Sequence, residues 1–363
     1  MSAHHRPRSE REQLELFRAL PGDLAPRDAQ DLMAYPFFSL AKTHRTTPID
    51  FRTNGITIRV EAVAEHGMAT IWDADVLIWV ASQIVEARDA GLRTSRLMAV
   101  RPREILTFTG RGTSARAYHR LKAALDRLQS TTVATSLRQI NERRMHRFSW
   151  INEWTERADA HGNADGIELI VPDWFYRAVL DDALVLTIDR GYFALTGGIE
   201  RWLYRVVRKH AGRQSNGWRF EFRHLHVKSA SLSPFKRFAF ELRDIVRRQP
   251  LPGYRLLIER NTGGRELLAF APTKLSTAGR GQHVEPHVLS GTDRHVPSGT
   301  HFTCYQEPAR PNSSGATTAS GSPNSESNSH ESNSSVVGRH RDGEKLESGC
   351  RFPPKRRLGA PRD

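Results

Sequence analysis

One segment of the chain, residues 108–139, changes its character in an order that few folds accommodate. It starts with a polar turn, in which Gly110 and Gly112 are free to take positive φ angles. Apolar residues at helical spacing follow over Ser114–Gln129. The β-branched run at 131–136 then favours a strand, and a loop dense in arginine comes next. Turn, helix, strand and basic loop in this succession are typical of a winged helix.

The arginines of this segment favour contact with DNA. They gather in two places, the edge of the expected helix and the loop after the strand: Arg116, Arg120, Arg127, Arg138, Arg143 and Arg144. A cationic edge beside a basic loop suits the phosphate backbone of a duplex. An ordinary surface helix with solvated arginines is the alternative that this segment leaves open.

The same order of elements recurs in the second half of the chain with different residues. A core helix is expected around Trp202, a strand at 218–222 and a second helix over Ser233–Arg248. Two short strands then flank the turn Asn261–Gly264, which has the composition of a hairpin turn. The sequence therefore predicts a second winged helix.

The helix over Ser233–Arg248 separates an apolar side from a basic side most clearly. Lys236, Phe240, Arg243 and Arg247 follow one another at helical spacing along one flank. We expect this helix to read bases in the major groove, and the helix of the first half to contact the backbone and take part in self-association. The other candidates for DNA contact in this half are Ser233, Arg237 and Arg255.

Charge and cysteine content narrow the class of partner. The formal net charge is +14, which favours a polyanion such as nucleic acid or an anionic membrane surface. A membrane has little support, because no apolar run approaches the roughly 18–20 residues that span a bilayer, and the N-terminus has no signal-peptide core. The two cysteines, Cys304 and Cys350, lie in a polar segment. We therefore expect a cytoplasmic protein without a disulfide scaffold, metal site or cofactor.

Composition divides the chain into four parts. We expect a polar N-terminal arm over residues 1–34, a first winged-helix domain over 35–171 and a second over 172–272. Residues 273–363 are rich in Gly, Ser, Asn and Thr and bury too little apolar surface to offset the entropy of ordering, so we expect a disordered basic tail. The predicted fold class is α+β, with two tandem winged helices.

Two motifs suggest other chemistry. The turn Gly110–Ser114 superficially resembles a phosphate-binding loop, but it lacks the required spacing, and we expect a simple turn. His224 and His226 fit the His-hydrophobic-His pattern of rolling-circle nucleases, because alternate residues share one face of a strand. Tyr204 and Tyr254 are the candidate nucleophiles. A nicking enzyme is therefore an alternative, although no Tyr-x-x-Lys follows at a suitable distance.

Five separated segments carry a resemblance to a known family. They read TIWDADVLIWVASQIVEARD (70–89), GRGTSARAYHRLKAALDRLQSTTVATSLRQ (110–139), RFSWINEW (147–154), LTGGIERWLYRVVRKHAG (195–212) and KSASLSPFKRFAFELRDIV (228–246). In this order they resemble the plasmid replication initiator protein A family of bacteria, over residues 37–270. One departure is Ala230, which stands in Lys-Ser-Ala-Ser where the family pattern has Lys-Ser-Gly-Ser.

The resemblance implies a non-enzymatic initiator of plasmid replication. Such proteins bind repeated sites (iterons) in double-stranded origin DNA, help to open an adjacent AT-rich stretch and recruit host initiator and helicase machinery. A homodimer in equilibrium with the monomer is also expected. The remaining alternative is a transcriptional regulator with tandem winged helices, for which the chain offers no separate effector-binding domain.

Overall fold

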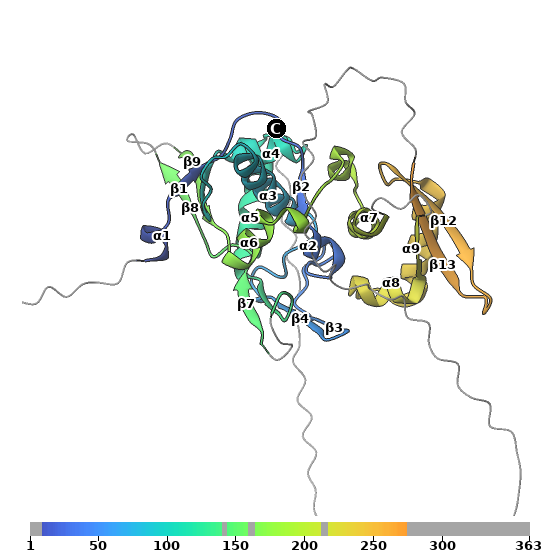
Figure 1. The fold of residues 1–363 in the computed structure, drawn as a ribbon. Helices are drawn as coiled ribbons and strands as arrows, with labels where there is room; N and C mark the ends of the chain where they lie inside the picture. The colour runs from blue at the N-terminus through green and yellow to red at the C-terminus, as the bar shows by residue number, and fades with distance from the viewer. Residues whose placement is uncertain (1–8, 140–143, 159–163, 212–216, 274–363) are drawn as a thin grey trace, which may run out of the picture. The chain divides into compact units, whose positions relative to one another are not determined.

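The computed structural model describes residues 9–139, 144–158, 164–211 and 217–273 (Figure 1). These residues form a mixture of helices and strands, so the α+β class is confirmed. The tail from residue 274 onward, for which the sequence favours disorder, lies outside the described residues, and so does Arg143.

The elements of the first half, up to residue 171, are α1 (Glu10–Gln13), β1 (Leu16–Arg18), β2 (Arg27–Ala29), α2 (Gln30–Ala34), β3 (Ile49–Thr53), β4 (Ile56–Glu61), α3 (Ala74–Asp89), β5 (Leu97–Val100), α4 (Pro102–Phe108), α5 (Ala115–Ser130), β6 (Thr132–Thr135), β7 (His146–Ser149), β8 (Glu153–Ala158) and β9 (Ala164–Ile170). Those of the second half are α6 (Asp173–Leu180), η1 (Asp182–Leu184), β10 (Val185–Thr187), η2 (Arg190–Ala194), α7 (Gly198–Ala211), β11 (Trp218–Glu221), α8 (Phe222–Ser229), α9 (Phe235–Arg248), β12 (Tyr254–Arg260) and β13 (Glu266–Pro272).

α5, α7 and α9 lie where the apolar periodicity predicts helices. Asp73 precedes α3, and its carboxylate accepts hydrogen bonds from the backbone N–H and the hydroxyl of Thr70 at 2.8 and 2.9 Å. Pro102 occupies the first turn of α4, where a missing N–H is tolerated. α5 follows the glycine-containing turn and leads directly into β6, as the segment 108–139 predicts.

The hairpin of β3 and β4 belongs to one sheet of the first half. β4 pairs with β3 and β6, in a sheet of order β3-β4-β6-β7. β3 is joined to β4 by the turn at Asn54 and Gly55, both at positive φ, which allows a tight hairpin. Residues 68–72 lead into α3 and make a single bridge, from Thr70 to Ser39.

The N-terminal segment is not a solvated arm. The short helix α1 precedes β1, which pairs in parallel with β5 in a sheet of order β1-β5-β9-β8. Further along, β2 pairs with β10 of the second half. Phe17, Leu24 and Met33 are buried in the core. A few apolar residues therefore outweigh the polar composition of this segment, because strand partners from distant parts of the chain satisfy its backbone.

The second half contains a regular succession of helix, strand, helix, helix, strand and strand. These are α7, β11, α8, α9, β12 and β13, and the three strands form an antiparallel sheet of order β11-β13-β12. Figure 1 shows β12 and β13 as an orange hairpin next to α9. The core helix, strand, second helix and two strands that the sequence predicts are therefore present in that order, with one more helix, α8, between β11 and α9.

Buried ion pairs join the two halves within one continuous hydrophobic core. Arg205 of α7 donates two hydrogen bonds to Asp28 of β2, at 2.7 and 3.0 Å, and both side chains are almost wholly buried. Arg201 of α7 and Arg111 both donate to Asp75 of α3 at 2.8–2.9 Å. α6 also packs against α3. α7 is therefore attached both to the first half and to the helices that follow it.

Candidate nucleic-acid interface

α8 and α9 form a helix-turn-helix, and the turn between them is closely determined. α8 ends at Ala230, which has the left-handed conformation with φ of 48°. Pro234 then precedes the first turn of α9. The imidazole of His226 hydrogen-bonds through Nε2 to the carbonyl oxygen of Ser233, at 2.8 Å. Ser233 therefore holds the turn in place, which is a structural task for a residue predicted to contact DNA.

α9 has two distinct sides. Phe238, Leu242 and Ile245 are buried against the core. The opposite side carries an outward row, which we define as Lys236, Phe240, Arg243 and Arg247, all exposed. The structure thus brings together on one face the residues that the sequence predicts for it.

The charges of α9 differ in how freely they can meet a ligand. Lys236 pairs with no acidic side chain among the described residues. Arg243 makes two hydrogen bonds to Glu266 of β13, at 3.0 and 2.6 Å, and these bonds lower the pKa of Glu266. Arg237 pairs with Glu241 one turn later, at 3.1 Å. These are exposed pairs, worth up to about 1 kcal/mol each, so a phosphate can displace them.

The hairpin after α9 presents further cations. Its turn is built by Asn261, whose side-chain oxygen accepts from the backbone N–H groups of Gly263 and Arg265, at 3.1 and 2.9 Å. Arg255 of β12, a predicted site residue, is exposed and lacks an ion pair to any other described residue. Arg260 is also exposed at the end of β12. The hairpin therefore has the charge expected of a wing beside the duplex.

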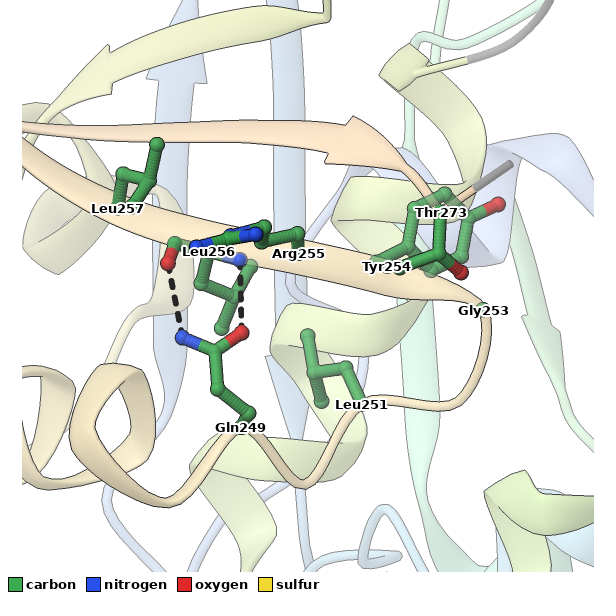
Figure 2. Close-up of a pocket in the computed structure, with 8 residues that line it drawn as sticks. All are labelled: Gln249, Leu251, Gly253, Tyr254, Arg255, Leu256, Leu257 and Thr273. Atoms are coloured by element: carbon green, nitrogen blue, oxygen red, sulfur yellow. Dashed lines mark hydrogen bonds between the residues drawn. The ribbon is translucent and has the colours of Figure 1, made fainter. Parts of the chain in front are cut away.

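Gln249 fastens the base of this hairpin to the end of α9. Its side-chain amide accepts from the backbone N–H of Leu256 at 2.9 Å and donates to the carbonyl of the same residue at 2.8 Å (Figure 2). It does so from a left-handed backbone, with φ of 49°. A surface pocket of about 460 Å³ lies beside it and is lined by Gln249, Leu251, Gly253, Tyr254, Arg255, Leu256, Leu257 and Thr273. The pocket gathers no set of converging polar groups comparable with a ligand site.

In the first half, Arg116 and Arg120 lie exposed on α5, without an ion pair to another described residue. Arg144 is exposed just before β7. These three are the predicted first-half residues that the structure leaves open to a polyanion.

Two other predicted site residues are already engaged. Arg127 makes a bidentate pair with Asp73, at 2.7 and 2.8 Å, and these hydrogen bonds raise its pKa. Arg138 lies 3.7 Å from the ring centroid of Trp174 and 3.0 Å from a carboxylate oxygen of Asp31. Both side chains hold elements of the fold together. We therefore leave them out of the interface proposed below.

The His-hydrophobic-His motif does not have the geometry that its nuclease interpretation requires. His224 and His226 lie in α8, a helix, where residues two apart point in different directions. The ring of His224 stacks on Phe220, and burial lowers its pKa. Tyr204, one candidate nucleophile, is buried, and its hydroxyl accepts from the backbone N–H of Asp189 at 2.7 Å. The strand on which the nuclease alternative depends is therefore replaced by a helix, and the periodicity of so short a segment does not separate the two.

Lys228 of α8 is a half-buried lysine that lies next to an aromatic ring of the first half. Burial, with a smaller contribution from Lys209, lowers the pKa of Lys228 to about 8. Its Nζ lies 5.3 Å from the ring centroid of Tyr35, and burial together with Asp31 raises the pKa of that tyrosine to about 12. Lys228 is thus partly covered by the first half, and it belongs to the packing between segments and not to the interface.

Two other classes of site are not found among the described residues. No group of three or more His, Cys, Asp or Glu side chains comes together there as a metal centre. Within the same ranges, no helix is both long enough and apolar enough to cross a membrane.

Comparison with known proteins gives a consistent match. The model of the family Replication initiator protein A matches residues 27–256. A protein of Wigglesworthia glossinidia brevipalpis described as a replication protein is 30% identical over 228 residues, which are 62% of this chain and 82% of that protein. Selenomethionine derivatives of domains 2 and 3 of RctB give a TM-score of 0.49 at 16% identity, covering 66% of this chain and 95% of theirs. A second structure of RctB domains 2–3 gives 0.46 at 14%, covering 67% and 96%. The two structural scores describe a distant likeness.

Proposed function

The chain belongs to the replication initiator protein A family, and on that premise we propose that it initiates plasmid replication by binding double-stranded origin DNA through two winged-helix modules. Repeated sites in the origin, opening of an adjacent AT-rich stretch and recruitment of host initiator and helicase machinery are parts of the same proposal. Its place of action is the cytoplasm, and it acts without catalysing a reaction.

The second module, α7 to β13, is proposed to select the sequence. The outward row of α9 is the observation that carries this proposal, because it combines cations with an exposed helical face opposite the core. A helix of this kind fits the major groove, where side chains reach base edges. The hairpin β12–β13, with Arg255 and Arg260 exposed, would then lie along the backbone.

The first module is proposed to contribute affinity rather than choice of sequence. Arg116 and Arg120 on α5 are exposed, and Arg144 extends the cationic surface before β7. Phosphate contacts of this type release counterions and give an affinity that falls with salt. Two linked modules bind DNA with higher overall affinity than either alone, because binding of the second becomes intramolecular once the first is bound.

A binding titration tests the role of α9. Fluorescence anisotropy would compare the duplex that flanks the gene with a scrambled duplex, for the unchanged protein and for Lys236→Ala combined with Arg243→Ala. Loss of base-edge contacts, about 1–3 kcal/mol for each good pair, lowers selectivity tenfold or more.

The matched control removes two exposed arginine charges elsewhere, with Arg52→Ala combined with Arg177→Ala. It should lower the affinity for both duplexes slightly and equally. Equal selectivity in the α9 variant and the control would contradict the proposed reading role.

A replication assay tests the biological role. The gene with its flanking DNA is placed on a plasmid that cannot otherwise replicate, and transformants are counted. Transformants are expected for the unchanged gene and not for the α9 variant. Absence of transformants with the unchanged gene, when the same DNA is bound selectively in vitro, would favour a regulator over an initiator.

A further inference from the structure

Phe240 is a large apolar side chain in an unusual place. It is 68% exposed, near the middle of α9 and opposite the buried residues Phe238, Leu242 and Ile245. It is therefore not needed for the core of this module. An exposed aromatic is also a weaker helix former than the charged residues around it, so helix stability does not account for it.

The surroundings of Phe240 indicate what kind of partner covers it. Lys236 lies one turn before it, and Arg243 and Arg247 lie one and two turns after it on the same face. An apolar protein partner would have to bury these three cations. The major groove instead offers the cations acceptors, base-edge atoms on its floor and phosphates at its rim, and it leaves base edges within reach of the ring.

The major groove presents one prominent apolar group. Among the four bases, thymine alone carries a methyl group at that edge, and phenylalanine is among the side chains that make apolar contact with it. The other base edges in this groove are hydrogen-bond donors and acceptors, which a phenyl ring cannot satisfy.

We infer that Phe240 is a specificity-determining residue that contacts the 5-methyl group of thymine in the major groove of the origin site. This inference rests on the proposed function, because it requires α9 to lie in the groove. It goes beyond it by naming the base, the atom on that base and the side chain that recognises it.

The test replaces thymine by uracil, which removes the methyl group and keeps the pairing edge. The duplex that flanks the gene is amplified once with dTTP and once with dUTP, and a scrambled duplex of equal thymine content is made in the same two forms. The unchanged protein should bind the uracil form of the cognate duplex about fourfold more weakly for one methyl contact, and about fifteenfold for two.

The second half of the test uses Phe240→Ala. This variant should bind the thymine form more weakly, and it should bind the thymine and uracil forms equally. The coupling energy between Phe240→Ala and the replacement of thymine by uracil then measures the contact between the ring and the methyl group. Leu92→Ala serves as the control, because it truncates an exposed apolar residue outside the proposed interface and should keep the full distinction. Far-ultraviolet circular dichroism and urea unfolding check that both variants keep the fold.

The outcomes separate the inference from the proposed function. Selective binding of the cognate duplex without any difference between thymine and uracil would overturn the inference and leave the proposed function standing. The same holds if Phe240→Ala weakens both forms equally, or changes nothing. If the unchanged protein binds the cognate and the scrambled duplex equally well, the proposed function itself is contradicted.

Discussion

The buried pair of Asp28 and Arg205 allows a stability prediction with a defined magnitude. The two side chains are 2% and 1% exposed, and two hydrogen bonds of 2.7 and 3.0 Å join them. We predict that Asp28→Ala destabilises the protein strongly. The substitution removes only a few atoms, but it leaves the guanidinium of Arg205 in the interior without an anion.

The expected loss is about 3–5 kcal/mol in the free energy of unfolding, because one partner of a buried pair is removed while the other stays charged. A domain is typically stable by about 5–15 kcal/mol, so this is a large fraction. The Nη1 atom of Arg205 already lacks a hydrogen-bond partner among the described residues, which leaves little room for compensation. Replacing both residues, as Asp28→Leu with Arg205→Met, should cost far less than the single change, since no charge then remains buried.

Urea unfolding followed by circular dichroism measures the effect as a shift of the midpoint at constant slope. Asp173→Ala is the matched control, because its carboxylate pairs with Arg177 on the exposed surface at 2.8 Å and should contribute at most about 1 kcal/mol. A loss below 1 kcal/mol for Asp28→Ala would refute the reasoning. So would a double variant that is less stable than Asp28→Ala.

Three further predictions follow from other sites. Lys228→Met should stabilise the protein below pH 8 by about 3 kcal/mol, because the folded chain gives up this proton near pH 8 and the unfolded chain near pH 10.5. The stability of the unchanged protein then rises with pH between these two values. The urea midpoints of the unchanged protein and of Lys228→Met should therefore approach each other over this pH range. Glu266→Gln frees Arg243 and removes a negative charge beside α9, so DNA affinity should rise and the salt dependence should steepen by about 0.9 in logarithmic slope. A titration over several salt concentrations measures this, and an unchanged slope would count against it. Ala230→Gly should stabilise the protein by about 0.5–1 kcal/mol in thermal unfolding, because φ of 48° is unfavourable for alanine and easy for glycine; a lower midpoint would contradict the argument.

Local patterns predicted three of the longer helices and the last hairpin well. α5, α7 and α9 each have an apolar stripe at helical spacing, and the turn at Asn261 joins two strands that are close in sequence. Such signals depend on neighbours within a few residues, so a single sequence contains them. The outward row of α9 was found for the same reason.

Long-range pairing limited the rest of the prediction. β1 pairs with β5, about 80 residues later in the chain, and no local sequence pattern predicts this strand pairing. Arg127 and Arg138 looked like free cations because their partners, Asp73 and Trp174, lie far away in sequence. The sequence places Phe240 on the basic flank without marking it as a site residue, and an aromatic at helical spacing within a basic row is the signal that points to it.

The two hydrogen bonds between Gln249 and Leu256 join the end of α9 rigidly to the base of the hairpin. A force that displaces β12 must either break both bonds together or carry the last turn of the helix with it. Gln249 therefore couples the position of the hairpin to that of the last turn of α9. If α9 lies in the groove of a duplex, a backbone shape that displaces the hairpin would also change the orientation of α9 relative to the bases. Binding would then depend on the shape of the backbone and on the identity of the bases together.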